Sequence, residues 1–437
     1  MTSRYASSRL TVSAVLSMAT VLVVVTAVAR SVGSIERHPP RVLWIFAAFF
    51  VAIAIGECLR VWLPGDRNAA PIGTAAAFAF ALLPADSGRG LGEVGFGEYG
   101  AATVIVVVSA ATLVGIGPHL LSGRYVDRDS VAHRLISTAL LAVVFRDLPL
   151  VAGGPLATVL DPAGGRRWAV ALVMMAAVLL ALLFDALLAS ALKAARDHSR
   201  LGATLRDELR TLAGMGSAIG STGILIALAM RPMGLLALPV FLAPLLLTQF
   251  AFRRFATVRA TYSQTIRSLS RVTELGGYTE TGHSVRVAEL AMAMGRDLGL
   301  SERDVRDLEY AALLHDIGQL SLTEAIPGGA TLMAAPREQQ RIASLGAEVV
   351  RQAGVLDKVA VIVEHQSAHY RRPHERSDAE VPLASRIIKV ANAFDDLVGD
   401  SLEGGRRANA LERIHLGLAY EYDPRVVTAL SRVMSRV

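Results

Sequence analysis

An adjacent histidine and aspartate, His315 and Asp316, offer an imidazole nitrogen and a carboxylate oxygen to one metal ion. They follow residues 308–314, in which Leu308, Ala311 and Ala312 recur at helical spacing. Gly318 stands two residues after the pair and predicts the end of the helix that carries it. A bare His-Asp-Ile-Gly string is a weak signal, because a lone histidine at a helix end is usually structural. Its meaning therefore depends on the elements around it.

The composition divides the chain into two parts. Of its 437 residues 53% are hydrophobic and 19% are charged, whereas a soluble protein averages about 25% charged residues. The apolar excess lies in residues 1–252. We therefore expect a transmembrane domain over 1–252, a linker helix over 253–275 and a soluble domain over 276–437.

The apolar part predicts a polytopic bundle. A span needs about 20 mostly apolar residues. Eight segments qualify: 10–29, 42–63, 70–85, 100–121, 135–153, 168–192, 211–230 and 233–252. The third is short, and only Arg231 and Pro232 separate the last two. Arg and Lys are more frequent in the loops on the N-terminal side, which predicts a multi-pass protein of the cell membrane with its N-terminus and soluble domain in the cytoplasm.

Ionisable residues occur within this apolar part. Glu57, Arg146, Asp147 and Asp185 lie in or near the expected spans, where such groups either serve a function or neutralise one another. Small residues at 216 and 220 form a Gly-x-x-x-Gly pair, which permits close helix packing. No repeat or polar path suggests a transporter, so sensing or anchoring in the lipid bilayer is the better interpretation.

The net charge of +6 does not predict a nucleic-acid polymer as partner. Much of the arginine flanks apolar segments, and no basic stretch is interleaved with stacking aromatics. The single cysteine, Cys58, excludes a disulfide framework and a cysteine-based zinc site.

The linker carries a helical stripe of apolar residues. Its members recur at steps of three and four: Phe255, Val258, Tyr262, Ile266, Leu269, Val272 and Leu275. Two interpretations remain open: a helix that forms a homodimer, and a first helix that packs on the soluble domain's own core. Beyond it, helical patterns cover 283–298, 339–353, 357–369, 382–397 and 424–437, with Ser301 as a helix start, so we predict an all-α domain.

Five segments of the soluble part form an ordered set of motifs. They are Tyr-Thr-Glu-Thr-Gly-His-Ser-Val-Arg-Val at 278–287, Ala-Leu-Leu-His-Asp-Ile-Gly at 312–318, Ile-Val-Glu-His at 362–365, Val-Pro-Leu-Ala-Ser-Arg-Ile-Ile-Lys-Val-Ala-Asn-Ala-Phe-Asp-Asp-Leu at 381–397, and Tyr-Asp-Pro at 422–424. Together they resemble the HD superfamily of metal-dependent phosphohydrolases. The spacing is closest to the HD-GYP branch, whose members are cyclic di-GMP phosphodiesterases. The resemblance covers about residues 262–437.

The resemblance implies an all-helical HD domain with a divalent ion, such as manganese or iron, that acidifies water for attack on phosphorus. It assigns metal ligation to His283, His315, Asp316 and His365. Asn392 stands where the family has a metal-binding Asp. Asp316 and Gln319 are the implied catalytic residues, Gln319 occupying the place of a lysine that serves phosphate.

Several family positions are altered. Ile342 stands where HD-GYP members place another histidine, and Gln366 and Ser367 replace the rest of a His-His-Glu motif. The Gly-Tyr-Pro loop is absent. A multinuclear site is therefore not expected, and two alternatives remain: a single weakly held ion at His283, His315 and Asp316, or no ion. Asp395 lies three residues after Asn392, and His369 four after His365, so either could supply a replacement ligand.

Two functions remain open at this stage. The first is a membrane-anchored phosphohydrolase that acts on a nucleotide phosphoester, with a cyclic dinucleotide as the implied substrate class. The second is an HD-GYP-like module without catalysis that binds a nucleotide or a partner and relays a membrane signal. The family favours the first, and the altered ligands favour the second.

Overall fold

The computed structural model describes residues 2–435 except 32–39, 64–66, 85–98, 124–125, 151–154, 160–166, 198, 323–325, 327–330, 332–333, 355, 372–380 and 400–403. The described residues are predominantly helical, as the sequence predicts, with one short hairpin. They form two compact units. The apolar unit comprises Ser3–Arg196 and Leu205–Thr257, and the C-terminal unit comprises Met1–Thr2, Asp197–Thr204 and Val258–Val437.

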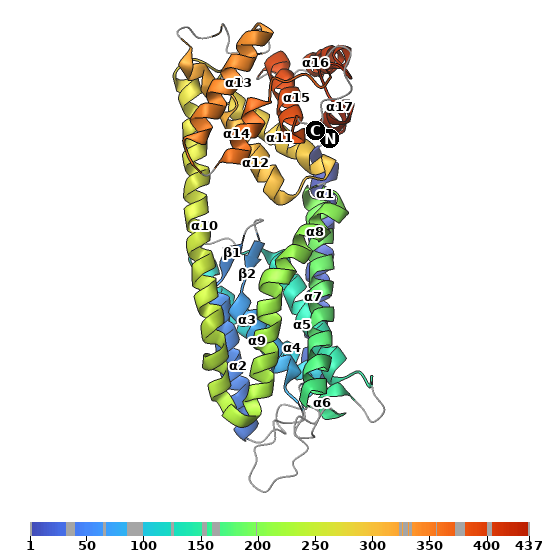
Figure 1. The fold of residues 1–437 in the computed structure, drawn as a ribbon. Coiled ribbons are helices and arrows are strands. Elements are labelled where there is room, and N and C mark those ends of the chain that lie inside the picture. The colour runs from blue at the N-terminus through green and yellow to red at the C-terminus, as the bar shows by residue number, and fades with distance from the viewer. Residues whose placement is uncertain are drawn as a thin grey trace. The chain divides into compact units, whose positions relative to one another are not determined.

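The first part of the chain runs through long helices and one hairpin (Figure 1). In order they are α1 (Thr2–Ser31), α2 (Pro40–Cys58), β1 (Val61–Leu63), β2 (Arg67–Ala69), α3 (Pro71–Leu82), α4 (Ala101–Leu121), α5 (Arg128–Arg146), α6 (Leu156–Val159), α7 (Arg167–Asp197), α8 (Leu201–Thr211), the π-helical η2 (Leu212–Gly216), α9 (Ser217–Met233), the 3-10 helix η3 (Gly234–Leu236) and α10 (Ala237–Leu275). The strands are antiparallel, with Val61 opposite Ala69.

Four helical stretches of the described residues are long and apolar enough to cross a membrane: Ser13–Ser31, Ala101–Leu121, Trp168–Arg196 and Leu201–Leu275. They indicate a membrane protein. Val42–Cys58 and Pro71–Leu82 are shorter apolar helices. At 1.5 Å per residue α3 is about 18 Å long, less than the roughly 30 Å of a bilayer core. The count of eight spans stays a prediction.

Two expected span boundaries differ from the structure. The segment 135–153 belongs to a helix that begins earlier, at Arg128, and ends at Arg146. Arg231 and Pro232 do not separate the last two segments, because α9 continues to Met233. The chain leaves α9 at Gly234, whose φ of 57° is a left-handed value that glycine adopts without steric cost.

Small residues bring the helices of the apolar unit into close contact. A Cβ atom on Gly56 would lie 2.3 Å from the backbone nitrogen of Gly73, so α2 and α3 touch through their backbones. On α9, a Cβ on Gly220 would lie 2.7 Å from Val178 Cγ1. A Cβ on Gly223, also on α9, would lie 3.1 Å from the Ala75 carbonyl oxygen of α3. Packed closely by α2 and α9, α3 is almost completely buried, with Phe78 and Phe80 at its centre.

Arg146 has a structural role. Its guanidinium donates to the carbonyl oxygens of Ala81 (2.9 Å), Leu83 (2.5 Å) and Tyr99 (2.9 Å), and it stacks on the Tyr99 ring with its Cζ 3.7 Å from the ring centroid. It thereby satisfies carbonyls at the C-terminal end of α3 that the helix itself leaves unpaired. Asp147 accepts a hydrogen bond from the Ala101 amide at the start of α4 (2.9 Å).

The C-terminal unit packs helices around one core of buried aliphatic residues (Figure 1). It contains α11 (His283–Leu298), α12 (Glu302–Leu314), the 3-10 helix η4 (Ile317–Ser321), α13 (Pro336–Arg351), α14 (Asp357–Glu364), α15 (Leu383–Val398), α16 (Gly404–Leu416) and α17 (Pro424–Met434). Ser301 caps α12 by accepting from the Asp304 amide at 3.2 Å. α14 ends at Glu364, five residues before the predicted end at His369.

Candidate metal centre

The His-Asp pair lies where α12 ends. The last α12 residue is Leu314, so His315 follows the helix and Asp316 immediately precedes η4. The prediction that Gly318 ends the helix is therefore wrong. Gly318 lies inside η4, and a Cβ on it would lie 2.0 Å from the carbonyl oxygen of Ile342. Its role is to let η4 contact the backbone of α13.

Two further elements face this pair. His283 is the first residue of α11, preceded by Gly282, whose φ of 79° turns the chain into the helix. Asn392 lies on α15. His283, His315 and Asp316 are buried, and their ligand atoms lie within 4.8 Å of one another. Packing between helices thus brings together side chains that lie up to more than a hundred positions apart in the sequence.

Three ligand atoms converge, and a fourth, Asn392 Oδ1, lies beside one of them. His315 Nε2 lies 3.1 Å from Asp316 Oδ2, 3.4 Å from His283 Nε2 and 3.1 Å from Asn392 Oδ1. His283 Nε2 lies 3.3 Å from Asp316 Oδ2. Ligands about 2.0–2.1 Å from one ion stand roughly 2.8–3.0 Å apart at adjacent octahedral positions and roughly 3.3–3.4 Å apart in a tetrahedral site. The spacing therefore fits a single transition-metal ion with nitrogen and oxygen ligands.

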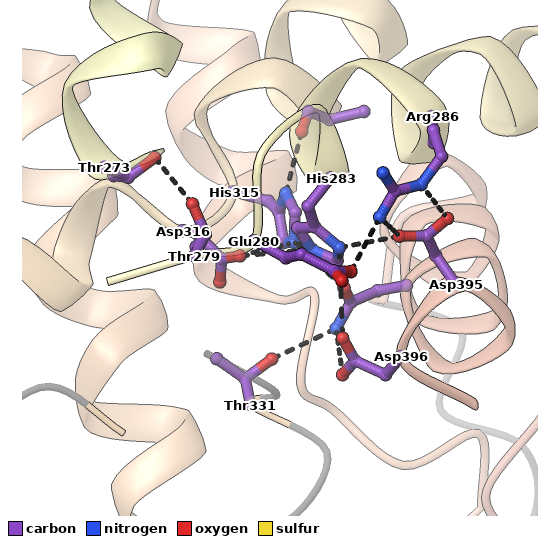
Figure 2. Close-up of polar contacts among 12 residues, drawn as sticks. Thr273, Thr279, Glu280, His283, Arg286, His315, Asp316, Thr331, Asp395 and Asp396 are labelled. Carbon is purple, nitrogen blue, oxygen red and sulfur yellow. Dashed lines mark hydrogen bonds and ion pairs between the residues drawn. The ribbon is translucent and has the colours of Figure 1, made fainter. Parts of the chain in front are cut away.

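The outer nitrogens of both imidazoles are fixed by hydrogen bonds. His315 Nδ1 donates to the carbonyl of Ala312 at 2.7 Å. His283 Nδ1 donates to Asp395 Oδ2 at 2.8 Å, and Arg286 holds the same carboxylate through two donors (Figure 2). With Nδ1 protonated, each neutral ring presents the Nε2 lone pair to the centre, the arrangement typical of metal-bound histidine.

Asn392 is oriented in the same way. Its Nδ2 donates to Thr331 Oγ1 (3.1 Å) and Asp396 Oδ2 (3.4 Å), which leaves Oδ1 directed at His315. Four acceptor atoms that face one another require a shared cation or protons, so the residues present fit a bound metal ion.

The ionisation of the group follows from burial and mutual charge. Burial lowers the pKa of His283, but hydrogen bonds to Asp316 and Asp395 and the charge of Asp396 outweigh it and raise the pKa to about 10. Burial also lowers the pKa of His315, and the charge of Asp316 raises it above its usual value. Burial raises the pKa of Asp316, but both imidazoles hold it well below its ordinary range. A metal ion therefore has to displace protons from this group.

The remaining predicted site residues lie elsewhere. His365 is not in the His-Asp group of the described residues; its Nδ1 faces the carbonyl of Val361 at 2.9 Å. Gln319 is fully buried in η4 and does not line the cavity beside Asp316. Asp395, offered as a replacement ligand, is instead the partner of His283 Nδ1. His369 lies beyond the end of α14, so it does not share a helical face with His365.

A cavity of about 40 Å³ adjoins the centre. Its described lining residues are Asp316, Thr331, Gln339, Ile342, Gln366, Ser367, Lys389, Asn392, Ala393 and Glu421. The Lys389 ammonium donates to the carbonyls of Ser367 (3.1 Å) and Ala368 (3.2 Å) and lies 3.5 Å from Glu421 Oε1. Sequence reasoning missed Lys389 and Arg286. Spacing could have indicated both, because each lies three residues before or after a predicted ligand on the same helix.

The sequence of the C-terminal unit matches a known family. The HD-domain family profile matches residues 267–426. Residues 267–426 are an HD domain. HD domains are metal-dependent, which agrees with the donor set of His283, His315 and Asp316.

The HD domain has relatives among characterised proteins. A cyclic di-GMP phosphodiesterase response regulator, RpfG, of Xanthomonas campestris pv. campestris is 28% identical over 194 residues, covering 41% of this chain and 51% of the relative. The 3'3'-cGAMP-specific phosphodiesterase 3 of Vibrio cholerae serotype O1 is 30% identical over 167 residues, 35% of each chain. A cyclic di-GMP phosphodiesterase of Thermotoga maritima is 28% identical over 129 residues, 26% of this chain and 33% of the relative. This chain thus spans about half or less of each.

Proposed function

We propose that this membrane protein binds one divalent transition-metal ion in its HD domain and hydrolyses a phosphodiester bond of a nucleotide, with cyclic dinucleotides as the substrate class. The observation that carries the proposal is the convergence of His283 Nε2, His315 Nε2 and Asp316 Oδ2 at 3.1–3.4 Å, with Asn392 Oδ1 3.1 Å from His315 Nε2. The activities of the three relatives supply the substrate class.

A single ion fits better than two. Ile342, which stands where HD-GYP members have a histidine, lines the cavity with an aliphatic side chain. Gln366 is turned to the protein, its Nε2 donating to the carbonyl of His315 at 2.6 Å. Neither offers a second ion a charged ligand. We assign no role to His365 or Gln319, because neither side chain lines the cavity.

The chain's own residues divide the remaining work. A bound divalent ion supplies acidification of water and neutralisation of phosphate charge. Asp395 and Arg286 hold the His283 ring in place, and Ala312 does so for His315. Lys389 brings a positive charge to the cavity wall, and a phosphate oxygen of the substrate can meet its ammonium by taking the place of the Glu421 carboxylate, which lies 3.5 Å away. Lys389 thereby supplies a positive charge for phosphate, which the neutral Gln319 cannot supply in place of the family's lysine.

The test uses the full-length protein in detergent. Bound metal is measured by mass spectrometry, and turnover of cyclic di-GMP and 3'3'-cGAMP is assayed with added manganese. We expect about one ion per chain and turnover that His315→Ala abolishes. His415→Ala, an exposed histidine whose Nδ1 bonds the Leu411 carbonyl, is the matched control. Metal-free protein without turnover would contradict the proposal.

The second candidate function is nucleotide binding without hydrolysis. The loss of charged ligands at Ile342 and Gln366 favours it, because a nucleotide phosphate meets less positive charge here than in a two-ion site. Both candidates use Lys389, so Lys389→Met should weaken cyclic dinucleotide binding by about tenfold or more, a loss of about 1.4 kcal/mol or more. Lys358→Met, at an exposed lysine, should leave binding unchanged. Binding without turnover selects the second candidate.

We further propose the domain division 1–252, 253–275 and 276–437, a cytoplasmic HD domain and a homodimer formed through the linker helix. Support comes from the apolar helices for membrane insertion. Exposed apolar residues on α10, such as Val258 and Val272, support the dimer. Protease digestion of sealed inverted and right-side-out vesicles tests the orientation, because only a cytoplasmic HD domain is cut in inverted vesicles alone.

A further inference from the structure

The apolar unit contains a buried polar network that the HD chemistry does not use. Glu57 at the end of α2, Arg60 after it and Arg134 on α5 form one group. His133, Ser137 and Asp185 form a second group between α5 and α7. Ionisable groups within apolar helices carry a large desolvation cost, so they are retained where a ligand or partner compensates it.

The first group has more hydrogen-bond donors than acceptors. Glu57 Oε2 lies 3.2 Å from Arg134 Nη2 and 3.6 Å from Arg60 Nε, so one carboxylate serves two guanidinium groups. The Arg60 and Arg134 side chains are 3% and 11% exposed. Arg134 Nη1 and all three guanidinium nitrogens of Arg60 are buried without a hydrogen-bond partner in the part of the chain that the structure describes. Buried donors without an acceptor destabilise the folded protein.

A cavity of about 70 Å³ opens beside Arg134. Helices α3, α5 and α7, the π-helical turn η2 and the start of α9 line it, and Phe78, Leu182 and Ile219 supply apolar walls. π-helical turns of this kind occur frequently at functional sites. The cavity therefore combines a cation with an apolar surface, as pockets for small amphipathic ligands do.

The carboxylates on the cavity wall do not accept hydrogen bonds from the unpaired donor of Arg134. Asp185 Oδ1 already accepts from His133 Nδ1 at 2.6 Å and from Ser137 Oγ at 3.1 Å. Glu208, also on the wall, has its own interaction within the protein. What remains unmet is the donor capacity of Arg134, which calls for an acceptor brought by a ligand. A guanidinium matches the paired oxygens of a carboxylate or phosphate.

We propose that this cavity binds an anionic oxygen group, a carboxylate or phosphate, through Arg134, with the ligand's apolar part against Phe78, Leu182 and Ile219. Arg134 lies six residues after the start of α5, about 9 Å along its axis, and Pro71 at the start of α3 lines the same cavity. The site is thus near helix ends, at a depth that both a lipid headgroup and a small soluble anion can reach. The proposal is independent of the proposed HD activity.

The experiment uses the full chain in phosphatidylcholine nanodiscs. One arm adds phosphatidylglycerol to the disc, and the other adds succinate or inorganic phosphate to the buffer. Unfolding is followed by tryptophan fluorescence, which reports on the apolar unit because all three tryptophans, Trp44, Trp62 and Trp168, lie in its sequence. We expect a rise in Tm of about 3 °C or more in one arm, which identifies the source of the anion.

Two substitutions at one position assign the effect. Arg134→Lys keeps a positive charge for Glu57 but removes Nη1, so the ligand-induced shift should disappear while the protein remains folded. Arg134→Gln should behave likewise. Arg128→Gln, at an exposed arginine of the same helix, should retain the full shift. The proposal is overturned if neither anion source raises Tm, or if Arg134→Lys retains the shift.

Discussion

At the scale of single residues, the centre differs from a typical HD site in the charge of one ligand. Asn392 offers a neutral carbonyl oxygen, so His283, His315 and Asp316 must hold a dication with one negative charge. Nearby Asp395 does not make up the difference, because Arg286 and His283 engage both of its oxygens. We therefore expect weak metal binding in which protons compete with the ion.

Asn392→Asp should strengthen metal binding, because it places a second carboxylate against the ion. We expect the dissociation constant for manganese to fall by about tenfold or more, a gain of about 1.4 kcal/mol. Titration against a fluorescent chelator measures it. Asn409→Asp, at an exposed position of α16, is the control and should leave affinity unchanged. Equal affinities in the wild type and Asn392→Asp would show that Asn392 does not face the ion.

The convergence of His283, His315 and Asp316 could be predicted from motif order, because the fold fixes where each motif lies. The features of the site that the sequence does not predict depend on side-chain orientation. Asp395 was a plausible ligand by spacing, yet its carboxylate turns to Arg286 and Nδ1 of His283. Lys389 stands in the 381–397 segment three residues before Asn392, but its contact with residues 367–368 at the cavity depends on the packing of α15.

At the scale of elements, the position of the His-Asp pair depends on the contact between η4 and α13. Gly318 and Gly346 lie in this contact, and a Cβ on Gly346 would be 3.2 Å from the Gly318 nitrogen. From the sequence, Gly318 is interpreted as the end of a helix, whereas in the structure it permits a close backbone contact. Both roles favour glycine, so the sequence alone does not distinguish them.

Gly318→Ala should destabilise the HD domain strongly, because its Cβ would lie 2.0 Å from the Ile342 carbonyl oxygen. Relief of this clash would require the backbone of α13 or η4 to shift. We expect a loss of about 3 kcal/mol and loss of metal binding. Hydrogen exchange of α12 and α13 measures it. Gly405→Ala is the control: nothing lies within 4 Å of its added Cβ, and alanine favours a helix, so stability should be unchanged or higher.

Helix α17 begins at a buried charge whose ionisation makes stability depend on pH. Asp423 accepts from the Arg425 amide at 2.9 Å and pairs with Arg386 Nη1 at 3.2 Å. Burial raises the pKa of Asp423, but hydrogen bonds from Arg425 and Arg386 outweigh it and leave the pKa below its usual value. The stabilisation is therefore full above the unfolded-state pKa of about 3.9 and is lost as pH falls through the folded pKa.

Asp423→Asn should remove this dependence. The amide oxygen can still cap α17, but buried Arg386 loses its counter-charge, so we expect about 3 kcal/mol of destabilisation at neutral pH and a flatter stability profile below about pH 5. Hydrogen exchange of residues 424–434, corrected for intrinsic rates, measures both. Glu412→Gln, at an exposed acid, should keep the wild-type profile. A wild-type profile in Asp423→Asn would refute the assignment.

At the scale of the whole molecule, α10 has two distinct faces beyond the apolar unit. Ile266, Ser270 and Thr273 are buried, and Ile266 belongs to the HD-domain core. Val258, Tyr262, Leu269 and Val272 are 39–49% exposed. The sequence alone could not separate these faces, because Ile266 fits the apolar stripe by spacing. The structure supports packing on the HD core and leaves a second apolar face for another partner.

That second face has the spacing of a coiled-coil seam. Phe255, Val258, Tyr262, Thr265, Leu269 and Val272 follow one another at alternating steps of three and four, the period of 3.5 that keeps a straight seam between two helices. Like charges at Arg254 and Arg259 flank its beginning and would weaken pairing there. We therefore expect the contact between two copies to be closest at Tyr262 to Val272.

Cysteine cross-linking tests this seam, since Cys58 is the only native cysteine and Cys58→Ser removes it. In that background, Tyr262→Cys and Leu269→Cys should form disulfide-linked dimers when membranes are oxidised, because seam positions of paired helices face each other. Gln264→Cys, exposed but off the seam, should cross-link several-fold less. Equal cross-linking at Gln264 and Leu269 would indicate random collision, and monomers throughout would leave the exposed stripe to a different partner.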